Sequence, residues 1–223
     1  LDNLQLLPTG GADVAFVRGG SADPVKDEEA GLTSLGSLFF EPLWFFYRTD
    51  AAKRIDRKTG TLTSLPQLKG LRINVDKAGS GVPDIMDRMF RANHMDPATL
   101  NLSNLEQTPA TEALQAGLLD VIVLASAPQS PLVQKLLRAP DIQLMDFAQS
   151  DAYSRRFPFL QPVTLPRGVV DLAADLPSHD VSLLAATTPL LSREETHPAL
   201  RQLFAQTAQT LHGGAGWSNR ARD

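Results

Sequence analysis

Three consecutive residues, Gly79, Ser80 and Gly81, have the composition of a turn that can hold an anion. They follow an apolar run and precede a helical pattern, so we expect them at a strand-to-helix turn. The first turn of a helix carries unpaired backbone N–H groups, the Ser80 hydroxyl adds a donor, and glycine allows a ligand to approach the backbone. The alternative is an ordinary tight turn in which Ser80 caps the helix.

Two further segments are expected where buried strands end, the edge at which ligands bind in open α/β sheets. The first is Arg18-Gly19-Gly20. Arg18 could pair bidentately with a ligand carboxylate, or lie in solvent as an end-of-strand charge. The second segment contains Ser126, whose hydroxyl or neighbouring N–H groups could donate to a ligand. A plain loop leading into the next helix is the alternative for Ser126.

An aromatic segment, 35–48, is predicted to form a long strand. Pro42 cannot donate a ladder hydrogen bond, so the strand lies at a sheet edge, bends, or passes between lobes. Trp44 could form one wall of a cleft, although aromatic residues in a strand are more often part of the core. The Glu41 carboxylate could orient a ligand amine, or it could be exposed to solvent at the end of the strand.

Composition excludes several kinds of chemistry. The chain has no cysteine, and its four histidines (His94, His179, His197 and His212) show no metal-ligand spacing. We therefore predict no metal site and no cofactor. Ser80 lies in no Gly-x-Ser-x-Gly motif, and Gly79-x-Gly81 lacks the third glycine of a nucleotide fingerprint, so we expect that the protein is not an enzyme. A net charge of −4 does not indicate the excess of basic residues that is typical of a nucleic-acid-binding protein.

A sequence pattern that occurs twice, called here the repeated phrase, predicts the elements that would position these residues. Residues 10–17 and 116–123 each contain glycine, then aspartate, then an apolar run. This pattern is typical of a helix that ends at glycine and a buried strand that follows it. Two such units predict two α/β lobes with mainly parallel sheets and a ligand cleft between them. The aspartates, Asp13 and Asp120, are expected to bond backbone groups of the turn.

Hydrophobic periodicity, helix-capping residues and turn residues locate the remaining elements. A helix is expected over 82–93, with others opening near Thr108, Ser130 and His197. Strands are expected at 120–124, 142–147 and 181–187, a hairpin tip at 58–60, and an irregular proline-rich path over 153–177. The expected domain organisation is residues 1–48 as part of the first lobe, 49–69 as a crossover, 70–155 as the second lobe and 156–223 as the return to the first lobe.

Several phrases together resemble the TAXI family of TRAP-transporter solute receptors, which have the type II periplasmic binding protein fold. The resemblance covers nearly the whole chain. The matching phrases are Asn3-Leu4, Gly11 to Gly20, Leu35 to Trp44, Gly79-Ser80-Gly81, Ala116 to Asp120, Ala152 to Leu160, and His197 to Leu200.

The resemblance implies an extracytoplasmic receptor, periplasmic or tethered to the inner membrane. It would close on a small anionic organic solute, a carboxylate or an amino acid, and deliver it to a TRAP membrane permease. Members of the family begin with a strand–helix–strand segment that would precede Leu1, so we expect a first lobe that is incomplete at its N-terminus, and signal or anchoring segments outside these residues. Two alternatives use similar scaffolds: the ligand-sensing effector domain of a transcription regulator, and a transferase-like enzyme.

Overall fold

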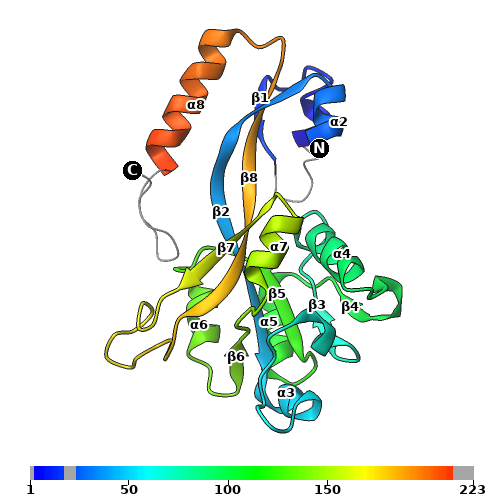
Figure 1. Cartoon of the computed structure of the whole chain (residues 1–223), viewed down its shortest axis with the longest axis vertical. Coiled ribbons are helices and arrows are strands. Elements are labelled where there is room, and N and C mark those ends of the chain that lie inside the picture. The colour runs from blue at the N-terminus through cyan, green and yellow to red at the C-terminus, as the bar shows by residue number, and fades with distance from the viewer. Residues whose placement is uncertain (1–2, 18–23, 213–223) are drawn as a thin grey trace.

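The computed structural model describes residues 3–17 and 24–212 (Figure 1). Its helices are α1 (Asn3–Leu6), α2 (Pro24–Glu29), α3 (Thr49–Ile55), α4 (Val82–Ala92), α5 (Gln107–Gln115), α6 (Pro131–Leu137), α7 (Ser150–Arg156) and α8 (Pro198–His212), with 3-10 turns η1 (Leu65–Leu68) and η2 (Pro97–Thr99). Its strands are β1 (Val14–Phe16), β2 (Leu32–Arg48), β3 (Arg72–Asn74), β4 (Asn101–Ser103), β5 (Val121–Ala125), β6 (Ile142–Leu144), β7 (Leu160–Leu165) and β8 (Val181–Arg193).

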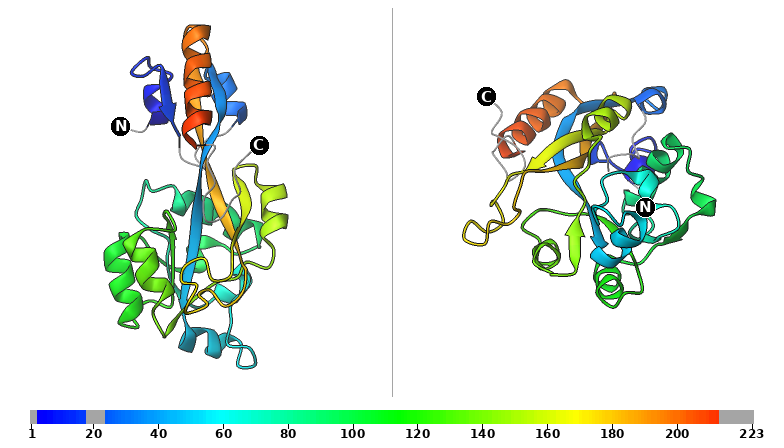
Figure 2. Two further views of the ribbon diagram at one scale, coloured as in Figure 1. Left: turned by 90° about the vertical axis from the view of Figure 1, so that its left-hand side faces the viewer. Right: turned by 60° about the horizontal axis from the view of Figure 1, so that its bottom comes forward.

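Two long antiparallel strands, β2 and β8, join a smaller lobe to a larger one (Figures 1 and 2). The smaller lobe contains α1, β1, α2 and α8 around the outer ends of these strands, and it has its own small apolar cluster of Leu7, Val17, Leu32 and Leu191. The larger lobe contains the other elements. The molecule is therefore the two-lobed α/β structure that the sequence predicts.

All of the strands belong to one sheet, with the order β1-β8-β2-β5-β3-β4, and β6 and β7 pair with β2 and β8. Strands β3, β4 and β5 are parallel because α4 and α5 cross between them. The long strands instead pair antiparallel with each of their neighbours. Parallel pairing thus forms the centre of the larger lobe, and the connection between the lobes is antiparallel.

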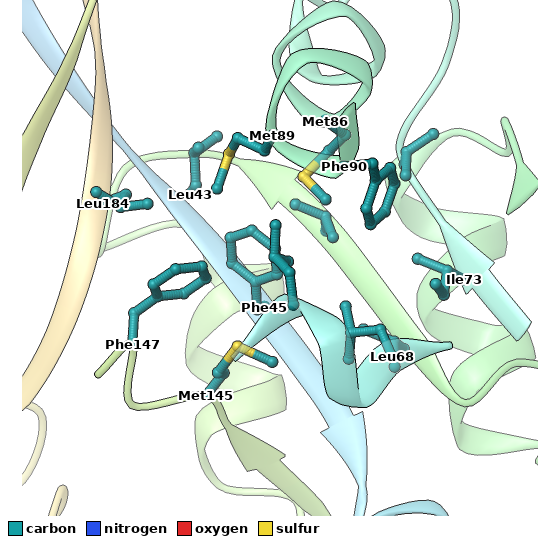
Figure 3. Packing of buried hydrophobic residues seen from close by; sticks show 14 of the residues in the cluster. Leu43, Phe45, Leu68, Ile73, Met86, Met89, Phe90, Met145, Phe147 and Leu184 are labelled. Atoms are coloured by element: carbon teal, nitrogen blue, oxygen red, sulfur yellow. The ribbon is translucent and has the colours of Figure 1, made fainter. Parts of the chain in front are cut away.

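The larger lobe has an apolar core on each face of the sheet. Along β2, Phe45 and Tyr47 belong to the cluster under α4, whereas Trp44 and Phe46 belong to the cluster under α5 and α6. Alternate side chains of a strand point to opposite faces, so an unbroken aromatic run fills both cores. Figure 3 shows the first cluster, where Phe45 lies among Met86, Met89 and other residues of α4 and the sheet.

The structure corrects two local predictions. Instead of a hairpin tip at 58–60, α3 ends in a turn in which the Asp56 carboxylate accepts the N–H groups of Lys58 and Thr59. The proline-rich path contains a strand, β7, with Pro162 inside it. Among the described strands β7 pairs with β8 alone, so Pro162 needs no second ladder partner there, which is the edge position where proline is tolerated.

The segment expected as the crossover, 49–69, lies in the larger lobe. Its buried residues pack into the core beneath α4, and they include Ala51, Leu65 and Leu68. The chain passes between the lobes in β2 itself, whose pairing with β8 shifts register between Ser34 and Phe39. Such shifts bend a strand locally, so the bend coincides with the junction of the two lobes.

The repeated glycine–aspartate phrase does form a helix end followed by a strand in both copies. Gly10 after α1 and Gly117 after α5 have left-handed φ values of 74° and 75°. The N–H of Leu118 donates to the Ala113 carbonyl across the second turn, at 2.9 Å. This is the glycine-terminated helix end predicted from the sequence.

Candidate functional site

The larger lobe contains a polar cavity of about 340 Å³ at the carboxyl ends of its parallel strands. Its wall is formed by the loops after β3 and β4, the end of β5 and one residue of β2. The lining residues are Glu41, Asp76, Lys77, Ser80, Glu106, Gln107, Thr108 and Ala125. This is the edge of an open α/β sheet where ligands ordinarily bind.

Glu41 places the cavity at the junction of the lobes. Along β2, Leu32 belongs to the apolar cluster of the smaller lobe and Leu43 to the core of the larger one. Glu41 lies between them and pairs with Ala186 of β8. Its side chain is exposed. A ligand in the cavity would therefore contact both the larger lobe and the connecting strand.

Asp76, directly after β3, is the most buried charged residue of the cavity wall, with 3% of its surface exposed. Its backbone has a left-handed φ of 64°, which aspartate tolerates better than most residues. One carboxylate oxygen accepts the Lys77 N–H at 2.7 Å, and the other accepts the Gln107 side-chain amide at 3.2 Å. These contacts fix the direction of the carboxylate.

Gln107, at the start of α5, connects the ends of β3 and β5 by hydrogen bonds. Its Nε2 donates to Asp76 and also, at 3.1 Å, to the carbonyl oxygen of Ala125 at the end of β5. Asn104 adds a bond from its side chain to the Asp76 carbonyl oxygen at 2.9 Å. The loops after β3 and β4 and the end of β5 are thus held as one rigid wall.

The charge of the cavity wall is predominantly negative. Glu41, Asp76 and Glu106 contribute carboxylates, and Lys77 contributes an ammonium group. The Lys77 Nζ lies 3.0 Å from Glu106 Oε1, and both of these side chains are more than half exposed. The cation of the wall is therefore already paired with a neighbouring carboxylate.

The Gly79-Ser80-Gly81 turn does precede α4, as expected, and Ser80 lines the cavity. The Ser80 N–H donates to the Lys77 carbonyl at 3.1 Å, and the Ser80 hydroxyl accepts the Val82 N–H at 3.4 Å. Two amides of the turn are thus engaged within it, which leaves the Ser80 O–H as a donor for a ligand.

Of the other predicted site residues, Trp44 and Ser126 lie in the described part of the chain, and neither lines the cavity. Trp44 is fully buried in the core under α5 and α6, so its ring does not form a wall of the cavity. Its Nε1 donates at 2.8 Å to the Ser126 carbonyl oxygen, which directly follows the cavity residue Ala125. Trp44 therefore supports the cavity edge from the core beneath α5 and α6, through this hydrogen bond. Arg18, Gly19 and Gly20 lie outside the described residues.

Sequence reasoning did not find the residues that follow β4, Glu106, Gln107 and Thr108. Strand β4 has three residues, too short for a periodic signal. The available signal is the rule that ligands bind where parallel strands end, which points to Asp76 and Lys77 because they follow the apolar run before the Gly79-Ser80-Gly81 turn.

Among residues 3–17 and 24–212, no group of three or more metal-ligating side chains is gathered in a way that could hold an ion. Within the same residues, none of the helices combines the length and the apolar character that a membrane span needs.

Comparison with solved structures shows that the fold is that of the type II periplasmic binding proteins. The periplasmic aliphatic sulphonate binding protein SsuA from Escherichia coli is 16% identical, with a TM-score of 0.51, over 93% of this chain and 58% of that one. The regulatory domain of Synechocystis PCC6803 CcmR, in complex with 2-PG, is 14% identical, with a TM-score of 0.53, over 93% of this chain and 77% of that one. The chain thus spans less than two thirds of the length of SsuA.

The chain belongs to the NMT1-like family, whose profile matches residues 1–215.

Proposed function

We propose that this protein is an extracytoplasmic solute receptor of the TAXI type. In this proposal it captures a small carboxylate-bearing organic solute by closure of its two lobes and delivers it to a TRAP-type membrane permease. It would act in the periplasm, free or tethered to the inner membrane, and would bind its solute without chemical change.

The observation that carries this proposal is the position of the cavity. It lies at the ends of β3 and β5 and is bounded by Glu41 of the connecting strand β2. A solute that touches both would stabilise a closed arrangement only to the extent that it binds that arrangement more tightly. The register shifts of β2 at the lobe junction supply a place for the bending.

Two groups in the cavity suit a solute carboxylate. The Lys77 ammonium could exchange its exposed partner Glu106 for the solute, and the Ser80 hydroxyl could donate to the same group. An exposed ion pair contributes little free energy, so the exchange costs little.

A ligand-sensing effector domain of a transcription regulator is the second candidate, favoured by the similarity to the CcmR regulatory domain. The two functions share the fold and a ligand site. The sequence of the full polypeptide would distinguish them, since a regulator needs a DNA-recognition helix and a receptor needs an export signal or a membrane anchor.

A thermal-shift screen of carboxylates and amino acids tests the proposal. A ligand present at 100 times its dissociation constant is expected to add about 2.7 kcal/mol to the free energy of unfolding. The Lys77→Gln variant should lose most of the stabilisation by carboxylates, whereas Lys69→Gln, an exposed lysine outside the cavity wall, should retain it. Absence of stabilisation by every compound would contradict solute binding.

A further inference from the structure

Lys77 and Glu106 connect two loops of the cavity wall that are far apart in the sequence. Lys77 lies in the loop after β3 and Glu106 in the loop between β4 and α5, and their side chains form the ion pair at 3.0 Å. Among the described residues that line the cavity, Lys77 is the one with a positive charge. A solute carboxylate and the Glu106 carboxylate therefore need the same ammonium group.

The Glu106 carboxylate forms this pair instead of capping the helix that it precedes. Glu106 is the N-cap residue of α5, yet its side chain makes no capping hydrogen bond to the first turn of that helix. Asp96, the N-cap residue of η2, shows the usual arrangement, because its side chain accepts the Ala98 N–H at 3.1 Å. The first turn of α5 favours negative charge, so the Glu106 carboxylate can turn toward it when it leaves Lys77.

We propose that Glu106 is an internal competitor for the solute carboxylate, which pairs with Lys77 when no solute is bound and is displaced when the solute binds. This inference rests on the proposed function and adds a residue that sets the affinity of the site. Both side chains of the pair are more than half exposed, so the pair can open into water without leaving a buried charge unpaired. The exchange of one carboxylate for another keeps Lys77 paired.

Glu106 lowers the affinity for a solute carboxylate in two ways. It must first leave the Lys77 ammonium group, and it then remains on the same cavity wall, where its charge repels the bound carboxylate. Glu106→Gln removes both effects and keeps the length and shape of the side chain. A change that merely damaged the wall would weaken binding, so a gain of affinity distinguishes competition from a structural role.

Isothermal titration with acetate, succinate and glutamate tests this role. Glu106→Gln is expected to bind each carboxylate that the unchanged protein binds about 3- to 10-fold more tightly, the combined effect of losing one exposed ion pair and one nearby like charge. The two proteins are compared in the same buffer at low ionic strength, because salt screens both effects.

Two controls separate competition from other changes of the cavity wall. Butanediamide has the carbon chain of succinate without its charges, so its affinity should not rise in Glu106→Gln. Glu112→Gln removes an exposed carboxylate of α5 outside the cavity wall, and this variant should bind succinate as the unchanged protein does.

Equal or weaker binding of the carboxylates by Glu106→Gln would overturn the role of Glu106 and leave solute capture intact. An equal gain for butanediamide would overturn it as well, since the gain would then not depend on charge. Failure of all three carboxylates to bind either protein would count against the proposed function, and the inference would fall with it.

Discussion

Replacing Trp44 by alanine is expected to lower the free energy of unfolding by about 3–5 kcal/mol, the usual cost of deleting a large buried aromatic side chain. Trp44 has no exposed surface, and its ring stacks on that of Phe46 with centroids 6.0 Å apart. Its Nε1 also supplies the hydrogen bond to the Ser126 carbonyl oxygen. The substitution would leave a void beneath α5 and α6 and an unpaired carbonyl at the cavity edge.

Urea unfolding followed by far-ultraviolet circular dichroism measures this effect. Trp44→Phe is the informative comparison, because it keeps an aromatic ring in the core while it removes the N–H donor and only part of the buried ring volume. We expect it to cost about 1–3 kcal/mol, the penalty for leaving one polar group unsatisfied. A loss below 1 kcal/mol in Trp44→Ala would show that the ring is not packed as described.

Asp120→Asn is expected to destabilise the protein by about 2–3 kcal/mol at neutral pH. The Asp120 side chain is 4% exposed and accepts the Arg72 guanidinium at 2.9 Å and the Arg54 guanidinium at 2.7 Å. It also accepts the Arg72 backbone N–H at 2.9 Å. The aspartate of the second repeated phrase thus bonds backbone, as predicted, and in addition joins β3 and α3 to the start of β5.

The pH dependence gives this prediction a distinct signature. Burial alone raises the pKa of Asp120, but the hydrogen bonds from Arg72 and Arg54 outweigh it and lower the pKa from 3.8 to about 2. A carboxyl group whose pKa is lower in the folded state contributes stability above its unfolded pKa, and the contribution is lost as the pH falls through the folded value. The difference between the two proteins should therefore be constant above about pH 5 and shrink between pH 4 and pH 2.

Urea unfolding at a series of pH values from 7 to 3 measures this difference. Asp87→Asn is the control, since Asp87 forms an exposed ion pair with Arg91 on one helix and should contribute only about 0.2–0.5 kcal/mol. A difference for Asp120→Asn that stays constant down to pH 3 would show that ionisation of Asp120 does not stabilise the fold.

Much of the architecture could be predicted because local signals and tertiary structure agree. Pro83 in the first turn of α4 and Gly117 after α5 mark real helix boundaries. Among the elements that were missed, β7 and α3 show that tertiary contacts can outweigh local propensity. Strand β7 forms despite Pro162 because it needs only the partner β8, and α3 forms where a charged, turn-rich composition favoured a hairpin.

The site was predicted less completely than the fold. Ser80 and Glu41 were recognised from local sequence, and both line the cavity. Asp76 and Gln107 are brought together only by the parallel pairing around β3, and no local pattern shows that an aspartate 31 residues before a glutamine will bond to it. The negative charge of the cavity wall is for the same reason a property of the folded chain.

The most direct test of solute capture in this cavity is a map of backbone amide shifts in the isotopically labelled protein, titrated with the carboxylates and amino acids of the thermal-shift screen as probes. The account predicts that a bound probe shifts amides in residues 76–80, 106–108 and 125, with smaller changes around Glu41. Shifts confined to α8 or to the far ends of β3 and β5, with none at the cavity wall, would contradict it.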